Sequence, residues 1–454
     1  MLHFLGDEFP AFAEALTHDP VRGLRVNTLK LSAGEFQKIS PFQLGEKVAW
    51  CDSAFSLPPT PPDGKEPGKH PFHLAGLYYL QDPSAMSAAE LLGPQPGERI
   101  LDLAASPGGK TTHIASLMQG KGILIANEIK TKRLNHLVVN VERWGAENLV
   151  VTNETPERLA DHFGAYFDRV LVDAPCSGEG MFRKDMGARL DWSEEMVAGC
   201  AVRQTNIMRV AAHLVRPGGH LLYSTCTFAP EEDEGIIARF LQEHSEFEVE
   251  ALPQLAGFMP GHPEWSGLGA QANSLRGAVR LFPHRVSGEG HFACLLSRKN
   301  GPSDETTFPM RRLKIPPSDW RLWQAFREET LAVDFPSERL RLQGDRLYFL
   351  PEEIPDMKGL RVTIPGIWLG NVKKERFEPA HPLAMHLRTG QAQNILSLTT
   401  NSREMAAFLR GESLPSEGTP GWTLVTADGW PLSWGKRVQG VVKNHFPRGW
   451  QIYS

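Results

Sequence analysis

Short apolar runs alternate with longer segments of helical periodicity between residues 98 and 222. The runs are rich in valine, isoleucine and leucine and end at polar or glycine residues, as buried strands do. Helical periodicity is clearest from Thr131 to Trp144, before Gly145, and from Glu194 to Val215, before Pro217-Gly218-Gly219. The predicted strands are Arg99–Ala104, Gly122–Ala126, Leu149–Thr152, Arg169–Asp173 and His220–Ser224.

This alternation of strands and helices is typical of βαβ units, in which consecutive strands run parallel. The four crossovers predict one doubly wound, Rossmann-like α/β domain with a mostly parallel sheet. Sheets of this kind bind ligands at the carboxyl ends of their strands. We therefore expect the functional residues to lie just after each strand.

The regions on either side of this domain follow other patterns. Phe9–Leu16 has the spacing of a short amphipathic helix, Leu24–Lys30 is predicted to be extended, and the proline-dense stretch Pro58–Lys69 predicts a loop. The composition changes again at Arg298–Pro317, which indicates a domain boundary. A chain of 454 residues exceeds what one hydrophobic core usually supports, so we expect accessory domains.

The overall composition is that of a folded protein, with 41% hydrophobic and 22% charged residues. The net charge of -5 shows no general excess of basic residues, so any surface that binds RNA must be local. The five cysteines are few, odd in number and widely spaced, which argues against a disulfide framework and a metal site. Without an apolar run of membrane-spanning length or a signal sequence, we expect a cytoplasmic protein with no membrane partner.

The segment Asp102-Leu-Ala-Ala-Ser-Pro-Gly-Gly-Lys110-Thr-Thr112 follows the first predicted strand and opens a helix. Gly108 and Gly109 allow the backbone to approach a ligand at the helix N-terminus. The end of the segment resembles a nucleotide-hydrolysing P-loop, but that motif needs glycine at position 104, where the chain has alanine. Taken alone, paired glycines can also mark only a tight turn.

Glu128 ends the second strand about 20 residues beyond the glycines, at the position where a carboxylate binds ribose hydroxyls. The dinucleotide motif G-x-G-x-x-G is absent, so the segment favours adenosine without pyrophosphate. The alternative role of such an acid is a helix cap.

Two cysteines come shortly after two consecutive predicted strands. Asp173-Ala-Pro-Cys176 comes after the fourth strand and Ser224-Thr-Cys226 after the fifth, so both thiols enter one pocket if those strands are adjacent. A single cysteine there is more often a buried apolar residue, but two beside a cofactor loop favour catalysis.

A thiolate that attacks C6 of cytosine makes C5 nucleophilic enough to take a methyl group. Asp173 can hydrogen-bond N3 and the exocyclic amine, and a second group can assist the release of the thiol. The residues alone do not say whether Cys176 or Cys226 attacks. In either case the base must be unstacked to reach them.

These segments resemble the Sun family of RNA cytosine-C5 methyltransferases, most closely its RsmF-like branch, which acts on small-subunit ribosomal RNA. Asp102–Lys110 is similar to the family's cofactor loop, with Ser106 where alanine is usual. Asp173–Lys184 and Tyr223–Glu231 are similar to its two cysteine motifs, and Arg280–Phe292 to the motif that closes the catalytic domain. The match covers nearly the whole chain.

The resemblance implies a class I methyltransferase domain that uses S-adenosyl-L-methionine. It divides the cysteine roles, with Cys226 as the nucleophile and Cys176 aiding release, while Asp173 binds the base. Lys184 is implied as an active-site basic residue and Gln81-Asp82-Pro-Ser84 as a support for the site, against the alternatives of a solvated lysine and a helix cap. We expect these cofactor-binding residues: Ala104, Ala105, Ser106, Pro107, Gly108, Gly109, Lys110, Glu128, Arg133, Asn153 and Asp173.

Both ends of the chain resemble RNA-binding parts of the family. Arg25–Lys30 is similar to its N-terminal RNA-contacting segment, and residues 421–450 to a C-terminal α+β module related to PUA domains. In the tail, basic residues alternate with aromatic ones, which suits phosphate contacts and base stacking, although aromatic packing in a small β core explains them equally well. These residues are Lys436, Arg437, Lys443, Arg448, Trp430, Trp434, Phe446, Trp450 and Tyr453.

We therefore expect a monomer that transfers a methyl group from S-adenosyl-L-methionine to C5 of cytidine in RNA, with 16S rRNA or the small ribosomal subunit as its partner. A transfer RNA substrate is the alternative. A non-catalytic RNA-binding assembly factor is the alternative of another class, but it would not need paired thiols. The expected parts are an N-terminal RNA-binding subdomain (1–75), the methyltransferase domain (76–300), a linker (301–316), a first C-terminal subdomain (317–385) and a PUA-like subdomain (386–454).

Overall fold

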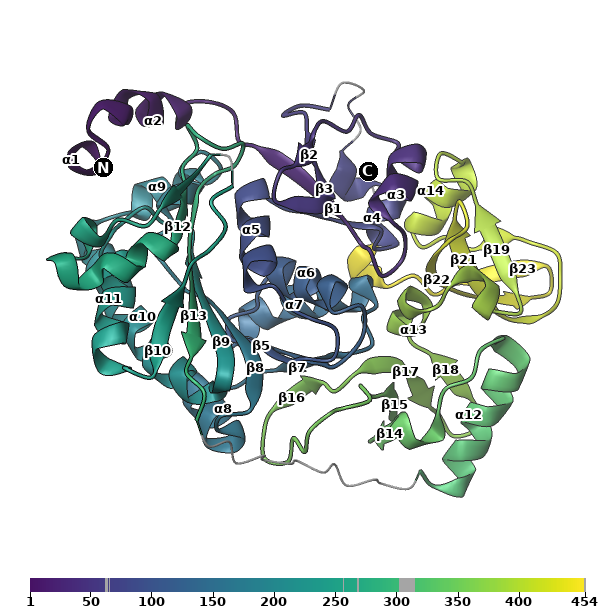
Figure 1. Ribbon diagram of the computed structural model, residues 1–454. Coiled ribbons are helices and arrows are strands. Elements are labelled where there is room, and N and C mark those ends of the chain that lie inside the picture. Colours follow the sequence, from purple (N-terminus) through teal and green to yellow (C-terminus); the bar gives the residue numbers. More distant parts are fainter. Residues whose placement is uncertain (62–63, 65, 256, 268, 302–314, 453–454) are drawn as a thin grey trace.

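The computed structural model describes all residues except 62–63, 65, 256, 268, 302–314 and 453–454. Its largest sheet has the strand order β11-β12-β13-β9-β8-β5-β6-β7-β16, and β10 pairs with β13 (Figure 1). The five central strands run parallel, which confirms the predicted Rossmann-like core. These strands are β5 (Arg99–Asp102), β6 (Ile123–Asn127), β7 (Leu149–Thr152), β8 (Phe167–Asp173) and β9 (Val215–Thr225).

Helices cover both faces of this sheet, because alternate residues of each strand face opposite sides. Leu101 and Ile125 pack into the core beneath one group of helices, while Ile100 and Leu124 pack into the core beneath the other. The first group is α8 (Pro156–Phe163), α10 (Glu194–Leu214) and α11 (Glu234–Glu243). The second is α5 (Pro83–Leu92), α6 (Gly109–Leu117) and α7 (Thr131–Trp144).

Antiparallel strands extend the sheet at both edges. On one side β13 (His291–Arg298) pairs with β9, followed by β12 (Val279–Leu281) and β11 (Phe258–Pro260), while β10 (Phe247–Glu250) also pairs with β13. On the other side β16 (Val362–Ile364) pairs with β7. The sheet thus includes a strand from the segment that we expected to form the first C-terminal subdomain.

The N-terminal part forms a smaller antiparallel sheet in the order β2-β3-β1-β4. The helix predicted at Phe9–Leu16 is present as α2. The predicted extended segment Leu24–Lys30 is extended only up to Val26, where β1 ends, and residues 28–30 form a turn. The described part of the predicted loop 58–69 includes a short 3-10 turn at Pro67–Lys69. The elements are α1 (Leu2–Leu5), α2 (Phe9–Ala15), β1 (Arg22–Val26), α3 (Ala33–Ile39), β2 (Lys47–Val48), β3 (Cys51–Leu57), α4 (Pro71–Leu74) and β4 (Tyr78–Leu80).

The C-terminal part contains two further sheets, in the orders β14-β15-β17-β18 and β19-β21-β22-β23-β20. Most of the expected linker 301–316 lies outside the described residues. The first group of elements is α12 (Pro317–Thr330), β14 (Leu340–Gln343), β15 (Arg346–Phe349), β17 (Ile367–Val372), β18 (Phe377–Pro379) and α13 (His381–His386). The second is β19 (Ile395–Leu398), α14 (Arg403–Leu409), β20 (Leu414–Pro415), β21 (Gly421–Ala427), β22 (Trp430–Val438) and β23 (Val441–Asn444).

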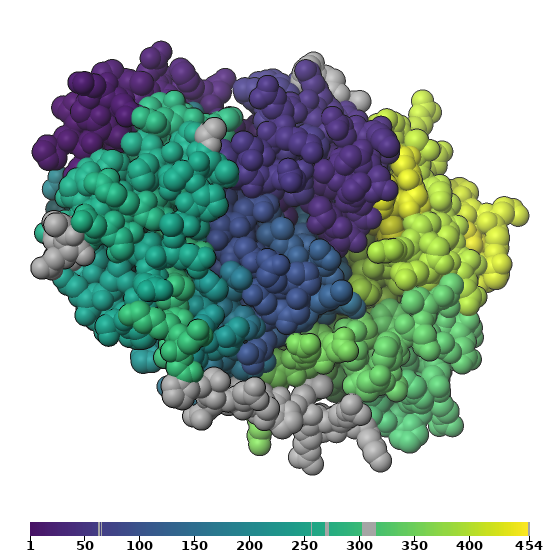
Figure 2. Space-filling view, viewed as in Figure 1, coloured from purple at the N-terminus to yellow at the C-terminus, as the bar shows by residue number. Residues whose placement is uncertain are grey.

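The two ends of the chain pack against each other. Leu24 and Phe36 of the N-terminal part share one apolar core with Phe408 and Leu432 of the C-terminal part. Figure 2 shows these purple and yellow parts of the surface in contact. Within the described residues, no helix combines the length and the apolar character needed to cross a membrane.

Candidate active site

A cavity of about 630 Å³ opens at the carboxyl ends of the central strands, where doubly wound sheets bind their ligands. It contains most of the residues that we predicted from the sequence. The predicted residues that line it are Ala104, Ala105, Ser106, Pro107, Gly109, Lys110, Glu128, Arg133, Asp173, Cys176, Lys184 and Cys226.

The two cysteines meet because β8 and β9 are neighbours, with Asp173 opposite Ser224. The sulfur atoms of Cys176 and Cys226 lie 3.3 Å apart. The loops that carry them are also joined, since the Gly180 backbone N–H donates to the carbonyl oxygen of Cys226 at 2.9 Å. The expectation that both thiols enter one pocket is therefore confirmed.

Asp173 is ionised at the centre of the cavity. Burial opposes its ionisation, but the Lys110 ammonium group, with Nζ 2.8 Å from Oδ2, lowers the pKa of this carboxyl. The Ser224 hydroxyl donates to Oδ1 at 3.1 Å. Asp173, at the end of β8, thus holds the side chain of Lys110 from α6. The fixed carboxylate of Asp173 faces the space beside the two thiols.

The two thiols differ in their electrostatic surroundings. The hydrogen bond with Cys176 lowers the pKa of Cys226, burial and the Asp173 carboxylate oppose this, and the Lys110 cation lowers it. The same hydrogen bond raises the pKa of Cys176, and burial and the nearby Glu232 carboxylate act in the same direction. This asymmetry makes Cys226 the better thiolate and keeps Cys176 a neutral thiol that donates a proton.

The other end of the cavity suits a nucleoside. Glu128 is 2% exposed, and its Oε1 accepts from the Lys130 backbone N–H at 2.8 Å. Its Oε2 is buried with no hydrogen-bond partner among the described residues, and Arg133 Nη1 lies 3.5 Å away. A buried carboxylate oxygen without a donor is costly, and a ribose hydroxyl in the cavity would satisfy it.

The loop between β5 and α6 has the conformation that its glycines predicted. Gly108 has φ +109°, and a Cβ there would come 3.2 Å from Leu137 Cδ1. Its role is to form the turn, since Gly109 but not Gly108 lines the cavity. Thr111 Oγ1 donates to Asp102 Oδ2 at 2.6 Å, so its hydroxyl is engaged with an acid, unlike a P-loop hydroxyl that binds a metal ion.

Asn153, which we expected among the cofactor-binding residues, lies beside the cavity with its amide engaged by the backbone. Its side-chain amide donates to the carbonyl oxygens of Glu128, at 2.6 Å, and of Ile129, at 3.1 Å, and Asn153 does not line the cavity. It holds the end of β6 in place. Ile129 and Pro156 line the cavity in that region, and the sequence analysis did not single them out because they carry no polar atom.

The N-terminal segment Arg25–Lys30 was also misassigned in part, because Arg25, Val26 and Asn27 are buried and cannot touch RNA. Arg25 Nη2 donates to the Gly109 carbonyl oxygen and to Thr112 Oγ1, both at 2.9 Å. Its guanidinium also lies over the Trp144 ring, 4.9 Å from the centroid. Arg25 therefore fastens the N-terminal sheet to the first turn of α6.

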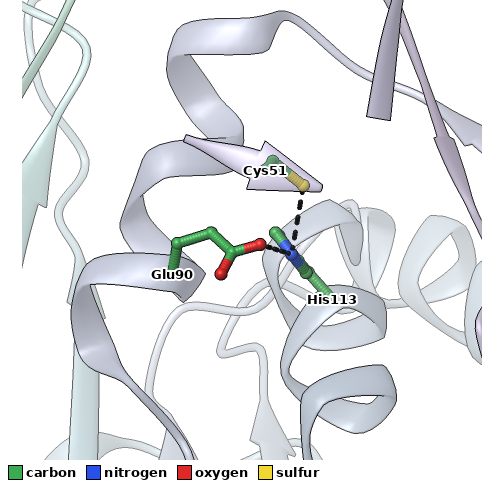
Figure 3. Close-up of side chains that lie close together, drawn as sticks. All are labelled: Cys51, Glu90 and His113. Carbon is green, nitrogen blue, oxygen red and sulfur yellow. Dashed lines mark hydrogen bonds and ion pairs between the residues drawn. The ribbon is translucent and has the colours of Figure 1, made fainter. Parts of the chain in front are cut away.

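A polar cluster lies beside this contact, where Cys51, Glu90 and His113 converge from β3, α5 and α6 (Figure 3). His113 Nε2 is 3.0 Å from Glu90 Oε1 and 3.7 Å from Cys51 Sγ. These are metal-ligand types, but the positive field of Arg25 reaches all three residues, and burial raises the pKa of the Cys51 thiol to about 12. We interpret the cluster as a hydrogen-bonded chain in which Glu90 balances the charge of Arg25.

Asp82 supports the wall of the cavity. It accepts from the Ala85 backbone N–H and the Ser84 hydroxyl at the start of α5, and its Oδ1 accepts from the Glu289 backbone N–H at 3.1 Å. The helix cap is present, but Asp82 supplies it and not Ser84, where the alternative interpretation placed it.

The closing motif contributes a residue that the sequence analysis missed. His291 begins β13, is 2% exposed and lines the cavity near Asp173. Burial and Lys110 lower its pKa to about 3, so the imidazole is neutral. The same motif supplies Arg280, which pairs with the buried Asp233 at 3.1 Å, and Asp233 in turn accepts from Thr225 beside Cys226.

The basic and aromatic tail is partly internal in the described residues, with Trp430, Lys436 and Trp450 half-buried. Trp434, Phe446 and Arg437 are buried, so the aromatic-packing alternative explains them and they are not available to RNA. Lys443 and Arg448 are exposed, and Tyr453 lies outside the described residues.

Comparisons with known proteins agree with this architecture. The family model described as 16S rRNA methyltransferase RsmB/F matches residues 89–297. Models of the N-terminal domain of 16S rRNA methyltransferase RsmF, of the RsmF first C-terminal domain and of the RsmF PUA domain match residues 1–83, 325–387 and 396–452.

Two relatives that match nearly the whole chain share the name ribosomal RNA small subunit methyltransferase F. The ribosomal RNA small subunit methyltransferase F of Erwinia tasmaniensis is 32% identical over 97% of this chain and 93% of its own length. That of Aeromonas salmonicida is 33% identical over 98% and 93%. The structure of a methyltransferase homologue from Pyrococcus horikoshii, 29% identical, has a TM-score of 0.56 and covers 64% of this chain and 91% of its own.

Proposed function

Since the chain belongs to the family of the ribosomal RNA small subunit methyltransferases F, we propose that it methylates C5 of a cytidine in small-subunit rRNA, with Cys226 as the nucleophile. The observation that carries this proposal is the pair of thiols, 3.3 Å apart, beside an ionised carboxylate. A protein that only binds RNA needs no such pair.

The proposed cofactor is S-adenosyl-L-methionine, which supplies the methyl group when bound. Glu128 would bind the ribose hydroxyls through the carboxylate oxygen that accepts no hydrogen bond among the described residues. The loop from Ala104 to Lys110 would enclose the rest of the cofactor at the N-terminus of α6. Arg133 closes this end of the cavity, since its Nη2 donates to the Ser106 carbonyl oxygen at 2.6 Å.

The reaction begins with Cys226. Its thiolate forms a bond to C6 of the base, and the electron pair of the C5–C6 double bond becomes available at C5. N3 takes up a proton from water as negative charge develops on the ring, and the Asp173 carboxylate accepts hydrogen bonds from that N3–H and from the exocyclic amine. C5 takes the methyl group in this form.

For release, the proton on C5 passes to water, and the electron pair of the C5–H bond re-forms the C5–C6 double bond as the bond from Cys226 to C6 breaks. The departing sulfur carries negative charge, and Cys176 is the neutral thiol placed to donate a hydrogen bond or a proton to it. Lys184 lies exposed at the rim of the cavity, where we propose that it meets the RNA backbone.

The pH dependence of Cys226 tests the electrostatic part of this proposal. Its lowered pKa means that the thiolate persists to a lower pH than an ordinary thiol allows and is lost as the pH falls through that value. In the C176A variant the largest stabilising hydrogen bond is absent, so the pKa rises. We expect the rate of alkylation of Cys226 by iodoacetamide, followed by peptide mass spectrometry, to titrate at a higher pH than in the parent protein. A C200A variant serves as the control, and an unchanged profile in C176A would contradict the proposed hydrogen bond.

The activity is tested by incubating the protein with S-adenosyl-L-methionine and small-subunit rRNA, both naked and in the assembled subunit. Nucleoside mass spectrometry should detect 5-methylcytidine, and bisulfite sequencing of cellular RNA with and without the gene should locate it. Methylation of another nucleoside, or of transfer RNA alone, would refute the proposal.

We also propose that the chain is divided into an N-terminal part, a methyltransferase domain and two C-terminal parts. In this proposal, surfaces of the N-terminal and C-terminal parts bind the RNA. Lys443 and Arg448 are the tail residues that remain exposed for phosphate contacts.

A further inference from the structure

An exposed apolar surface lies at the edge of the cavity. Half of the large apolar side chains that are exposed among the described residues fall between residues 186 and 202. Their exposed fractions are 63% for Met186, 80% for Leu190, 37% for Trp192, 37% for Met196 and 64% for Val202. Exposed apolar side chains gathered in one place usually mark an interaction site.

These residues lie in the stretch of chain between Lys184 and Arg203, which both line the cavity. Met186 and Leu190 are one turn apart on α9 (Met186–Asp191), which begins two residues after Lys184 in the cavity rim. Met196 and Arg203 are two turns apart on α10, and Arg203 lines the cavity. We call Met186, Leu190, Trp192 and Met196 the apolar lip.

The apolar lip is connected to the loop of the nucleophile. Trp192 Nε1 donates to Glu179 Oε1 at 3.1 Å. The other carboxylate oxygen, Glu179 Oε2, accepts from the Phe228 backbone N–H at 2.9 Å and from Thr227 Oγ1 at 3.1 Å, immediately after Cys226. Glu179 therefore fixes the indole relative to the nucleophile.

The border between the apolar lip and the cavity is basic. Lys184 and Arg203 are exposed there, and neither forms an ion pair with a carboxylate of the described chain. The acid closest to Lys184 in sequence, Asp185, is engaged, because its Oδ1 accepts from the Gly187 backbone N–H at 2.8 Å and caps α9. Two cations without a carboxylate partner among the described residues, next to exposed apolar side chains, suit a ligand that has both phosphates and flat apolar faces.

We propose that the apolar lip holds the nucleotides that flank the target cytidine. This rests on the proposed function, because a base that enters the cavity must leave its stack and exposes the faces of its neighbours. Met186, Leu190 and Trp192 cover those faces, while Lys184 and Arg203 contact the phosphates on either side. The occupant is single-stranded RNA next to the modified position.

The test uses the full-length L190S and M186S/L190S variants, since these side chains are largely exposed and their loss leaves the core intact. V202S is the matched control, because Val202 is exposed on α10 but lies about 120° around the helix from Met196. For both lip variants we expect KM for the methylated RNA to rise about tenfold, with unchanged affinity for S-adenosyl-L-methionine and little change in V202S.

Photocrosslinking identifies the occupant. Small-subunit rRNA that contains 4-thiouridine should crosslink to a peptide within residues 182–197 of the parent protein, and less in L190S. Unchanged KM values in the two variants, together with no crosslink to this peptide, would overturn the inference. It would also be overturned if the variants lost affinity only for the assembled subunit and not for naked rRNA, because that result would indicate a protein partner. If the parent protein makes no 5-methylcytidine on any RNA, the proposed function itself has failed.

Discussion

Replacing Cys226 with alanine is expected to abolish methyl transfer. Without the thiol no bond forms to C6, and C5 of cytosine stays a poor nucleophile, so the rate should fall by a factor on the order of 10⁴ or more. The affinity for S-adenosyl-L-methionine should stay unchanged, because the proposed cofactor contacts come from Glu128 and the loop before α6 and not from the thiol. Radiolabelled methyl transfer and isothermal titration calorimetry measure the two quantities.

Two variants make this result specific. C226S keeps the size of the side chain but replaces the thiol with a hydroxyl, which is hardly ionised near neutral pH, so it should be as inactive as C226A. C200A removes a buried thiol from α10, outside the cavity, and should retain activity once its folding is verified by thermal melting. Substantial activity in C226A would refute the assignment of the nucleophile.

Replacing Cys176 with alanine is expected to trap the enzyme on its substrate. The Cys176 thiol lies 3.3 Å from the sulfur of Cys226 and is neutral, so its loss removes the group that assists the departure of that sulfur. The bond to C6 should still form, although more slowly at low pH. Denaturing gel electrophoresis of C176A with substrate RNA should show a slowly migrating protein–RNA adduct that the parent protein accumulates far less.

The double variant C176A/C226A is the control for this experiment, since it lacks the attacking thiol and should give no adduct. The absence of a slowly migrating species in C176A would argue against the release role. An equal amount in the double variant would show that another residue forms the bond.

The strand ends were predictable from the sequence because they depend on local patterns. Alternating apolar runs placed Asp173 and Ser224 at the ends of β8 and β9, and their pairing brings the two cysteine loops together. The turn at Gly108 was also predictable, since glycine tolerates the positive φ that the turn needs.

Other features depend on contacts between distant parts of the chain and left no local signal. The ion pair between Lys110 and Asp173 joins α6 to β8. The contact between Cys176 and Cys226, which shifts their pKa values in opposite directions, joins the loops after β8 and β9. The sequence of Arg25–Lys30 indicates a basic, extended segment and gives no sign that Arg25 is buried against α6. Asn153 follows β7 as expected, but its amide is engaged by the carbonyl oxygens at the end of β6.

The most direct test of the account is to map the covalent bond. The C176A variant is incubated with S-adenosyl-L-methionine and substrate RNA, then digested with protease and nuclease, and the modified peptide is sequenced by mass spectrometry. The account predicts a methylated cytidine nucleotide attached to Cys226. A nucleotide on Cys176, or none on either cysteine while the RNA still becomes methylated, would contradict it.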